Sequence, residues 1–147
     1  MSGLRDLYQE VILDHNKRPR NFRAIDPASH HAEGFNPLCG DRITVFLDVK
    51  DGLITDLTFQ GSGCAISTAS ASLMTEALKG KAVGDVESLF DGFHDLVTSD
   101  APARPGLGKL TVLAGVREYP TRVKCATLAW HTLRAALERR ADVVATE

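Results

Sequence analysis

The 147-residue sequence has little of several features that would point to a common class of function. Its net charge is only −2, which argues against the concentrated positive charge of a protein that binds nucleic acid or an anionic membrane. The first ten residues, MSGLRDLYQE, carry charges too early and too often for a signal peptide. The uncharged stretch 59–75 approaches the length of a membrane span, but its Gly, Ser and Thr content favours a loop and a buried helix. We therefore expect a cytoplasmic protein without a membrane segment or a nucleic-acid partner.

Cysteine is also scarce, and the number of cysteines limits what they can do. Three cysteines is an odd number, which argues against a framework of disulfides. Without an export signal, reduced thiols are the expected state. The functional question is therefore whether these thiols react or bind a metal.

The remaining composition is that of a globular protein, with 44% apolar and 24% charged residues. Alternating apolar residues predict two strands on either side of Lys50-Asp51-Gly52 and a short edge strand at 31–35. Helical spacing predicts helices over residues 3–15, 64–78, 83–97, 110–117 and 125–140. We expect an α+β fold in one domain over residues 1–147, with a small three-stranded antiparallel sheet flanked by about five helices.

The register of the central hairpin decides which side chains meet. Its apolar residues must share one buried face. A two-residue Asp-Gly loop would pair odd with even positions and split that face, whereas a three-residue loop pairs odd with odd. We therefore predict the three-residue loop, with Val45 opposite Leu57 and Ile43 opposite Phe59.

The same register brings cysteines from the two strands together. Extended past the strand ends, it puts Cys39 and Asp41, within the sequence NPLCGD, beside Cys64. Opposed residues of an antiparallel pair have Cα atoms about 4.5–5.5 Å apart, close enough for a shared metal ion or for thiol exchange. Gly40 would let the chain bend so that the side chains of Cys39 and Asp41 reach one ion.

The third cysteine, Cys125, is expected, like Cys64, at a helix N-terminus, where partial positive charge favours a thiolate. Arg122 adds positive charge beside it. Three cysteines and one aspartate make four ligands, the number of a tetrahedral zinc site, although their spacing matches no compact zinc motif. Taken one at a time, each cysteine also fits a role as buried filler, and Asp41 fits a turn residue. None of the five histidines is assigned to the metal, and His15 is expected to complement the dipole at the end of the first helix.

Three segments of the chain are familiar in sequence: HHAEGFNPLCGD, GCAISTASASLMTEALKGK and VREYPTRVKCATLAWHTL. Together they resemble the SufU branch of the IscU/NifU-like iron–sulfur assembly proteins, and the resemblance covers nearly the whole chain. It implies that Cys39, Asp41, Cys64 and Cys125 are zinc ligands. It also implies that Cys39 accepts sulfur from a pyridoxal-phosphate cysteine desulfurase of the SufS type.

Departures from the IscU-type scaffolds bear on function. Those scaffolds carry a histidine where this chain has Lys124, and YPTRVKCA lacks their Leu-Pro-Pro-Val-Lys chaperone motif. These differences favour a zinc-dependent sulfurtransferase that passes sulfur to downstream SUF assembly machinery, with Arg122 supporting the charge of the site. One alternative is a scaffold that assembles and transfers a [2Fe–2S] cluster on the same ligands, with iron or the cluster in place of zinc. Another is a zinc-stabilised interaction module that never carries sulfur.

Overall fold

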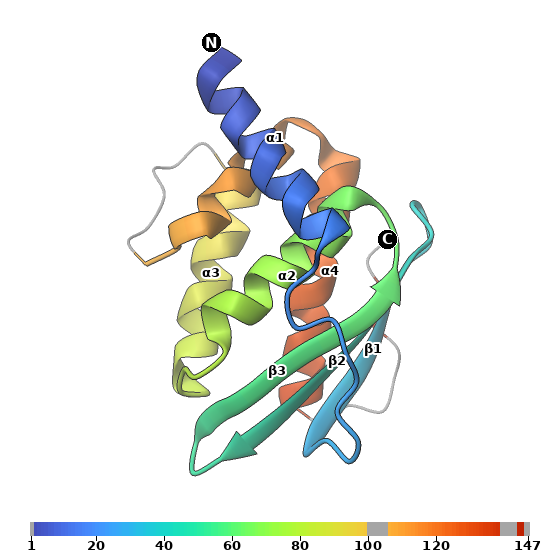
Figure 1. The fold of residues 1–147 in the computed structure, drawn as a ribbon, viewed down its shortest axis with the longest axis vertical. Helices are drawn as coiled ribbons and strands as arrows, with labels where there is room; N and C mark the ends of the chain where they lie inside the picture. Colours follow the sequence, from blue (N-terminus) through green and yellow to red (C-terminus); the bar gives the residue numbers. More distant parts are fainter. Residues whose placement is uncertain (1, 100–105, 139–143, 146–147) are drawn as a thin grey trace.

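A computed structural model describes residues 2–99, 106–138 and 144–145 (Figure 1). Its elements, in chain order, are α1 (Ser2–Lys17), β1 (His30–Asn36), β2 (Asp41–Lys50), β3 (Leu53–Ser62), α2 (Ala65–Leu78), α3 (Gly84–Thr98), the 3₁₀ helix η1 (Gly108–Glu118), α4 (Pro120–Leu137) and β4 (Val144–Ala145). Within these residues, three long antiparallel strands and five helices confirm the predicted α+β fold. None of the described helices is long and apolar enough to cross a membrane.

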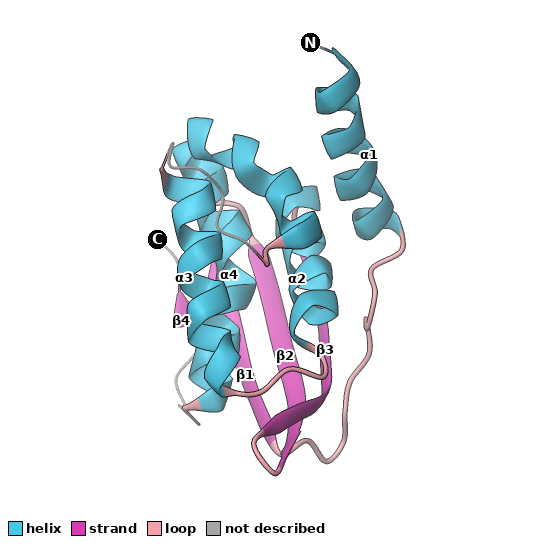
Figure 2. Cartoon of the chain, turned by 90° about the vertical axis from the view of Figure 1, so that its left-hand side faces the viewer, coloured by secondary structure: helices cyan, strands magenta, loops and turns pink. Residues whose placement is uncertain are grey.

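The sheet has the strand order β3-β2-β1-β4. The predicted edge strand is β1, and the short β4 adds to it in parallel at Gly34 and Phe35. Helices α2, α3 and α4 gather on one side of the sheet, with α1 standing away from it (Figure 2). Of these helices, α4 contacts β1 and β2, and α2 contacts β3 and α1. The core therefore lies between the sheet and its helical layer, with α4 packed on β1 and β2.

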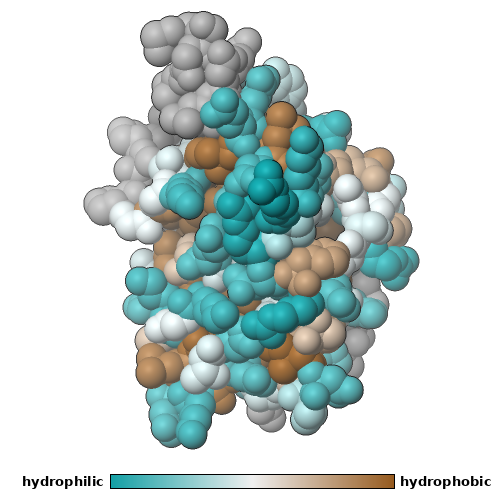
Figure 3. All heavy atoms as spheres, viewed as in Figure 1, coloured by the Kyte–Doolittle hydropathy of each residue, from teal (hydrophilic) through white to brown (hydrophobic). Residues whose placement is uncertain are grey.

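The core is built from the alternating face of the hairpin and from aromatic side chains of the helices. Ile43, Val45 and Leu47 of β2 are buried against this layer. Behind them, the ring of Trp130 in α4 stacks on Phe93 of α3, with centroids 4.6 Å apart. On the face seen in Figure 3, by contrast, hydrophobic residues are scattered among hydrophilic ones. Because one face of each strand is buried and the other is not, apolar and polar residues alternate along the sequence of the strands.

The predicted three-residue hairpin loop is wrong. Lys50 pairs with Leu53, and the turn consists of Asp51 and Gly52, whose φ angles are 54° and 77°. Two successive positive φ angles are typical of the type I′ turn, whose twist matches that of the strands it joins. Together with a bulge in β3, this turn puts Val45 opposite Phe59 rather than the predicted Leu57, and Ile43 opposite Gly61 rather than the predicted Phe59.

A β-bulge reconciles this turn with a single apolar face. Val49 pairs with Ile54 but Asp48 pairs with Asp56, so Thr55 is an extra residue of β3. Beyond the bulge, odd positions again oppose odd positions. Ile54 itself is held from outside the hairpin, because its N–H donates to Lys81 O at 2.8 Å and its carbonyl accepts from Gly80 N at 2.7 Å.

The last predicted helix begins earlier than expected. The sequence predicts a break at Pro120 and a helix that begins at Cys125, but Pro120 is the first residue of α4. Proline suits this first position, because its missing N–H would have no helical partner there and its φ angle is already helical. Cys125 therefore lies in the second turn of α4 and not at a helix N-terminus.

Candidate metal centre

The loop that joins β1 to β2 and the segment that leads from β3 into α2 lie at the same end of the sheet (Figure 1). Cys39 lies in the loop of residues 37–40 that joins β1 to β2, and Asp41 is the first residue of β2. Cys64 immediately precedes α2, and Cys125 faces the same region from α4. All three cysteines are free thiols. Gly40 has a φ of 70°, which fits the bend expected between Cys39 and Asp41.

Three of the four predicted ligands form a compact group. Ligand atoms of Cys39, Asp41 and Cys125 all lie within 4.8 Å of one another. The Sγ atoms of Cys39 and Cys125 are 3.2 Å apart. Asp41 and Cys125 are fully buried, whereas Cys39 is only half-buried. Two sulfurs and a carboxylate at this spacing form a donor set that suits zinc or iron.

Cys64 lies at the margin of this group. Its Sγ is 4.0 Å from Asp41 Oδ2, and its backbone N–H donates to Asp41 Oδ1 at 2.8 Å. As predicted, it stands at a helix N-terminus, where its Sγ accepts the N–H of Ser67 at 3.4 Å. The carboxylate can approach so closely because residue 63 is glycine: a Cβ there would lie 2.4 Å from Asp41 Oδ1.

The electrostatics of Cys125 differ from the sequence prediction. Burial raises the pKa of the Cys125 thiol, and its hydrogen bonds with Cys39 and Asp41 raise it further. The predicted help from a helix N-terminus is absent, because the residue lies inside α4. A thiol that resists ionisation in this way becomes a thiolate ligand when a metal cation supplies the compensating charge. The donor set therefore fits a metal ion better than it fits three free thiolates.

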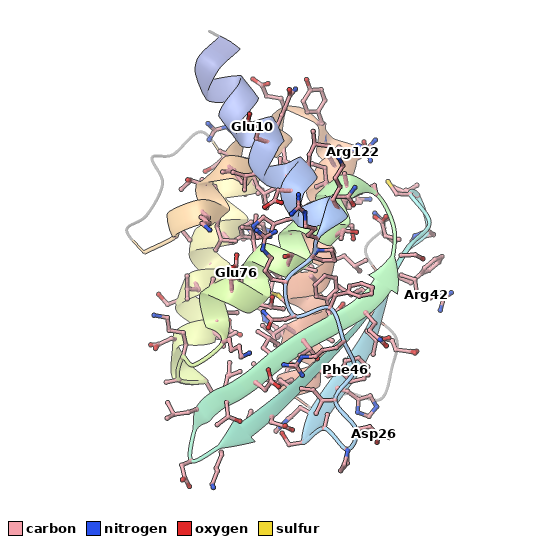
Figure 4. The ribbon with its side chains drawn as sticks, in the orientation of Figure 1. Glu10, Asp26, Arg42, Phe46, Glu76 and Arg122 are labelled. Atoms are coloured by element: carbon pink, nitrogen blue, oxygen red, sulfur yellow. The ribbon has the colours of Figure 1, made fainter. Side chains whose placement is uncertain are left out.

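Arg122 is an exposed cation in the first turn of α4, near this group (Figure 4). The Cys125 side chain beside it, followed by the charge of Cys64, raises the pKa of Arg122. Its guanidinium is therefore close enough to interact electrostatically with Cys125 and Cys64.

Asn36 is a site residue that the sequence analysis missed. It is the last residue of β1, and its side chain is completely buried. Its amide nitrogen lies 3.3 Å from Asp41 Oδ2 and 3.5 Å from Cys125 Sγ. A signal was available, because asparagine before proline at the end of a strand is typical of a turn that the side chain helps to close.

Comparison with known proteins identifies the family. The family model described as the NifU-like N terminal domain matches residues 7–139. The chain belongs to this family. It is 41% identical over 143 residues to the iron–sulfur cluster assembly scaffold protein IscU of Streptococcus pyogenes serotype M1, covering 97% of this chain and 89% of the relative.

Two further comparisons confirm the resemblance to the SufU branch. The zinc-dependent sulfurtransferase SufU of Bacillus subtilis (strain 168) is 38% identical over 139 residues, covering 94% of each chain. A crystal structure from Fervidobacterium islandicum AW-1, named as an iron–sulfur cluster assembly scaffold protein for the SUF system, aligns with a TM-score of 0.83 at 34% identity. That alignment covers 87% of this chain and 94% of the solved one. The relatives thus share a field of function, while their names divide between scaffold and sulfurtransferase.

Proposed function

We propose that this chain is an iron–sulfur cluster assembly protein of the IscU/SufU type, and that it acts there as a zinc-dependent sulfurtransferase. It would accept persulfide sulfur from a SufS-type cysteine desulfurase and pass it to downstream SUF machinery. We assign this activity to a single domain over residues 1–147, working in the cytoplasm. The observation that carries the proposal is the contrast between Cys39, half-buried on a loop, and its fully buried neighbours Asp41 and Cys125 on regular elements.

The proposed metal ligands are Cys39, Asp41, Cys64 and Cys125, which would hold zinc in a closed set of four. Bound zinc would keep the thiols deprotonated at neutral pH. Three thiolates and a carboxylate exceed the charge of one divalent ion, and Arg122 would offset part of the remainder. Iron or a [2Fe–2S] cluster could take the same ligands.

The chemical step proposed for Cys39 is a thiol–persulfide exchange. The Cys39 thiolate attacks the terminal sulfur of a persulfide on the desulfurase cysteine. One sulfur–sulfur bond forms and one breaks, and the desulfurase cysteine leaves as a thiolate that takes up a proton. No external oxidant or reductant is consumed. The loop position of Cys39 favours this role, because a loop residue can move towards a partner with less disturbance than a residue inside a helix or strand.

The decisive experiment maps where the sulfur goes. The protein is incubated with the desulfurase and cysteine, and persulfides are located by mass spectrometry after alkylation. We expect persulfide on Cys39 and none in a Cys39→Ser variant, with a reaction lacking cysteine as the control. Persulfide on Cys64 or Cys125, but never on Cys39, would contradict the assignment.

A scaffold role is the second candidate, because relatives such as the Streptococcus pyogenes protein are named as scaffolds. It predicts that anaerobic reconstitution with iron and sulfide yields a [2Fe–2S] cluster that transfers to an apo-protein. A zinc-stabilised interaction module, the third candidate, predicts that Cys39→Ser impairs folding while no sulfur ever resides on the protein. Persulfide mapping, cluster transfer and thermal unfolding of the same preparations separate the three.

A further inference from the structure

The buried amide of Asn36 contacts the candidate metal centre from inside the protein. Asn36 ends β1, and its partner in the sheet register is Asp41, so the pair closes the loop that carries Cys39. No part of Asn36 is exposed to solvent. A buried amide without partners would destabilise the fold, so each of its polar atoms must be accounted for.

The orientation of this amide follows from one backbone group. The N–H of Leu38 can only donate, and it points at the Asn36 side chain, so the atom 3.2 Å from it is the oxygen Oδ1. The NH₂ group must then face the other way. Its nitrogen can donate to two acceptors, Asp41 Oδ2 at 3.3 Å and Cys125 Sγ at 3.5 Å.

A neutral hydrogen-bond donor stabilises these two acceptors, Asp41 Oδ2 and Cys125 Sγ, more strongly than it would stabilise neutral groups. Both are buried, and both carry negative charge when they bind a metal. Hydrogen bonds to charged acceptors are roughly twice as strong as those between neutral groups. The other close contacts of Cys125 Sγ are the Cys39 thiol and the carbonyl of Thr121. The charged Arg122 guanidinium acts on Cys125 from the exposed side, whereas the Asn36 amide supplies a neutral donor from the buried side.

We propose that Asn36 is a positioning residue of the metal centre, with a separate task for each end of its amide. The NH₂ group holds Asp41 and Cys125, the ligands that stay on the metal, and stabilises their charge. The carbonyl group fixes the loop from which Cys39 moves to collect sulfur. The inference rests on the proposed metal site and on the proposed mobility of Cys39.

Two variants separate these tasks. Asn36→Asp keeps an oxygen for the Leu38 N–H but replaces the donating NH₂ with a second acceptor, whereas Asn36→Ala removes both ends. The matched control is Asn21→Asp, the same atomic exchange at a half-buried amide that bonds Thr75 and Lys79 away from the centre. Asn21 has a φ of 58°, a conformation that aspartate tolerates.

The first readout is zinc affinity, measured by competition with a chromogenic chelator. Loss of an outer hydrogen-bond partner typically weakens metal binding by about 10- to 100-fold, so we expect a loss of that size in Asn36→Asp and none in Asn21→Asp. In the cobalt-substituted protein, the thiolate-to-metal charge-transfer band of Asn36→Asp should shift to lower energy, because the Cys125 sulfur loses a donor. A merely structural role would lower thermal stability without moving this band.

The second readout needs no metal. In chelator-treated protein, alkylation of Cys39 followed by mass spectrometry should be faster in Asn36→Ala than in wild type, and nearly unchanged in Asn36→Asp. Equal zinc affinity and an unshifted cobalt band in a folded Asn36→Asp protein would overturn the donor role. Equal alkylation rates in Asn36→Ala and wild type would overturn the loop role. None of these measurements uses a desulfurase, so a wild-type protein that binds zinc but accepts no sulfur would refute the sulfur-transfer role alone.

Discussion

Two clusters of polar side chains along α2 are instructive when set side by side. The cysteine cluster consists of Cys39, Asp41 and Cys125 with Asn36, next to the start of α2. The histidine cluster lies further along the helix, where His15 of α1 meets Ser72 and Glu76 of α2. In both, burial disfavours charge: it raises the pKa of Cys125 and lowers that of His15. Only their internal balance of donors and acceptors differs.

The histidine cluster is complete as it stands. His15 Nε2 lies 3.5 Å from the Glu76 carboxylate, so that nitrogen carries the proton of the neutral ring. Nδ1 then accepts from the Ser72 hydroxyl at 2.7 Å, and the same hydroxyl accepts the backbone N–H of Arg20 at 2.8 Å. Glu76, labelled in Figure 4, reaches this cluster from the exposed side of α2. No cation is needed, and the sequence-based expectation of a charged His15 at the end of α1 is corrected.

The cysteine cluster lacks such a balance. Its sulfur and carboxylate groups are acceptors once they ionise. Among the residues that the structure describes, the neutral donors that reach Asp41 and Cys125 are the Asn36 amide and the N–H of Cys64. The comparison teaches that buried polarity alone does not mark a binding site. A cluster in which ionisable thiols and carboxylates outnumber the hydrogen-bond donors does mark a binding site, because a bound cation stabilises its negative charge.

The sharpest test of this contrast removes the buried carboxylate. Asp41→Ala should weaken zinc binding by more than about 100-fold, since loss of an outer partner alone costs about 10- to 100-fold. The control is Asp56→Ala, which removes a carboxylate that already pairs with Arg23 and Lys79. Zinc affinity of both variants is measured by chelator competition, with circular dichroism to confirm folding. A folded Asp41→Ala protein that holds zinc as tightly as wild type would rule out ligation by Asp41.

The neighbourhood of this site was predictable from the sequence for a specific reason. An error of two positions in the register leaves every side chain on the correct face, so Asp41 still arrived beside Cys64 although the opposing residues were wrong. The turn was predicted wrongly because alternation within the strands cannot report a bulge. The bulge at Thr55 adjoins Ile54, which bonds to residues 80 and 81, far along the chain.

Other parts of the site depend on contacts that a linear pattern does not contain. Cys125 was expected at a helix N-terminus because Pro120 was taken as a break, whereas it begins α4. The 3.2 Å contact between Cys39 and Cys125 follows from how α4 packs on β1, which periodicity does not specify. The contacts of Asn36 with Asp41 and Cys125 likewise become visible only when the strand and the helix are assembled.

A smaller effect is expected from breaking the histidine cluster. Ser72→Ala leaves His15 Nδ1 and the Arg20 N–H without their partner, and a buried polar group without a partner costs about 1–3 kcal/mol. We expect the free energy of unfolding in urea to fall by about that amount. Zinc affinity should stay unchanged, because the cluster is complete without a metal. A Ser72→Ala protein with weakened zinc binding would show that the two clusters are coupled.

The smallest effect is the pH dependence of the same cluster. Burial, and then the charge of Arg20, lowers the pKa of His15 below 6.5, with partial opposition from Glu76. The unfolded chain therefore binds a proton more readily than the folded one. Stability falls as the pH drops below about 6.5 towards the lowered folded value, with a slope of up to about 1.4 kcal/mol per pH unit.

His15→Gln should flatten this slope, measured as the free energy of unfolding between pH 7.5 and 5. Burial also lowers the pKa of His131, so His131 adds to the same pH dependence of stability. Comparing His15→Gln with His131→Gln separates the contribution of His15 from that of His131. Taking differences from wild type at each pH removes the contribution that bound zinc would make, because neither substitution alters a proposed zinc ligand. A slope in His15→Gln equal to that of wild type would contradict a neutral, buried His15.

The backbone hydrogen bonds of Gly80 and Lys81 with Ile54 also affect how another protein could pair with the edge of the sheet. β3 is an outer strand of the sheet, and an uncovered outer strand invites a foreign strand to join it. Here Gly80 and Lys81 occupy the backbone of Ile54, and Asn21 occupies the N–H of Phe59. Residues from before the hairpin (Asn21) and after it (Gly80 and Lys81) thus hydrogen-bond to the outer edge of β3 at two positions. A foreign strand would have to displace these segments before it could pair along the whole edge of β3.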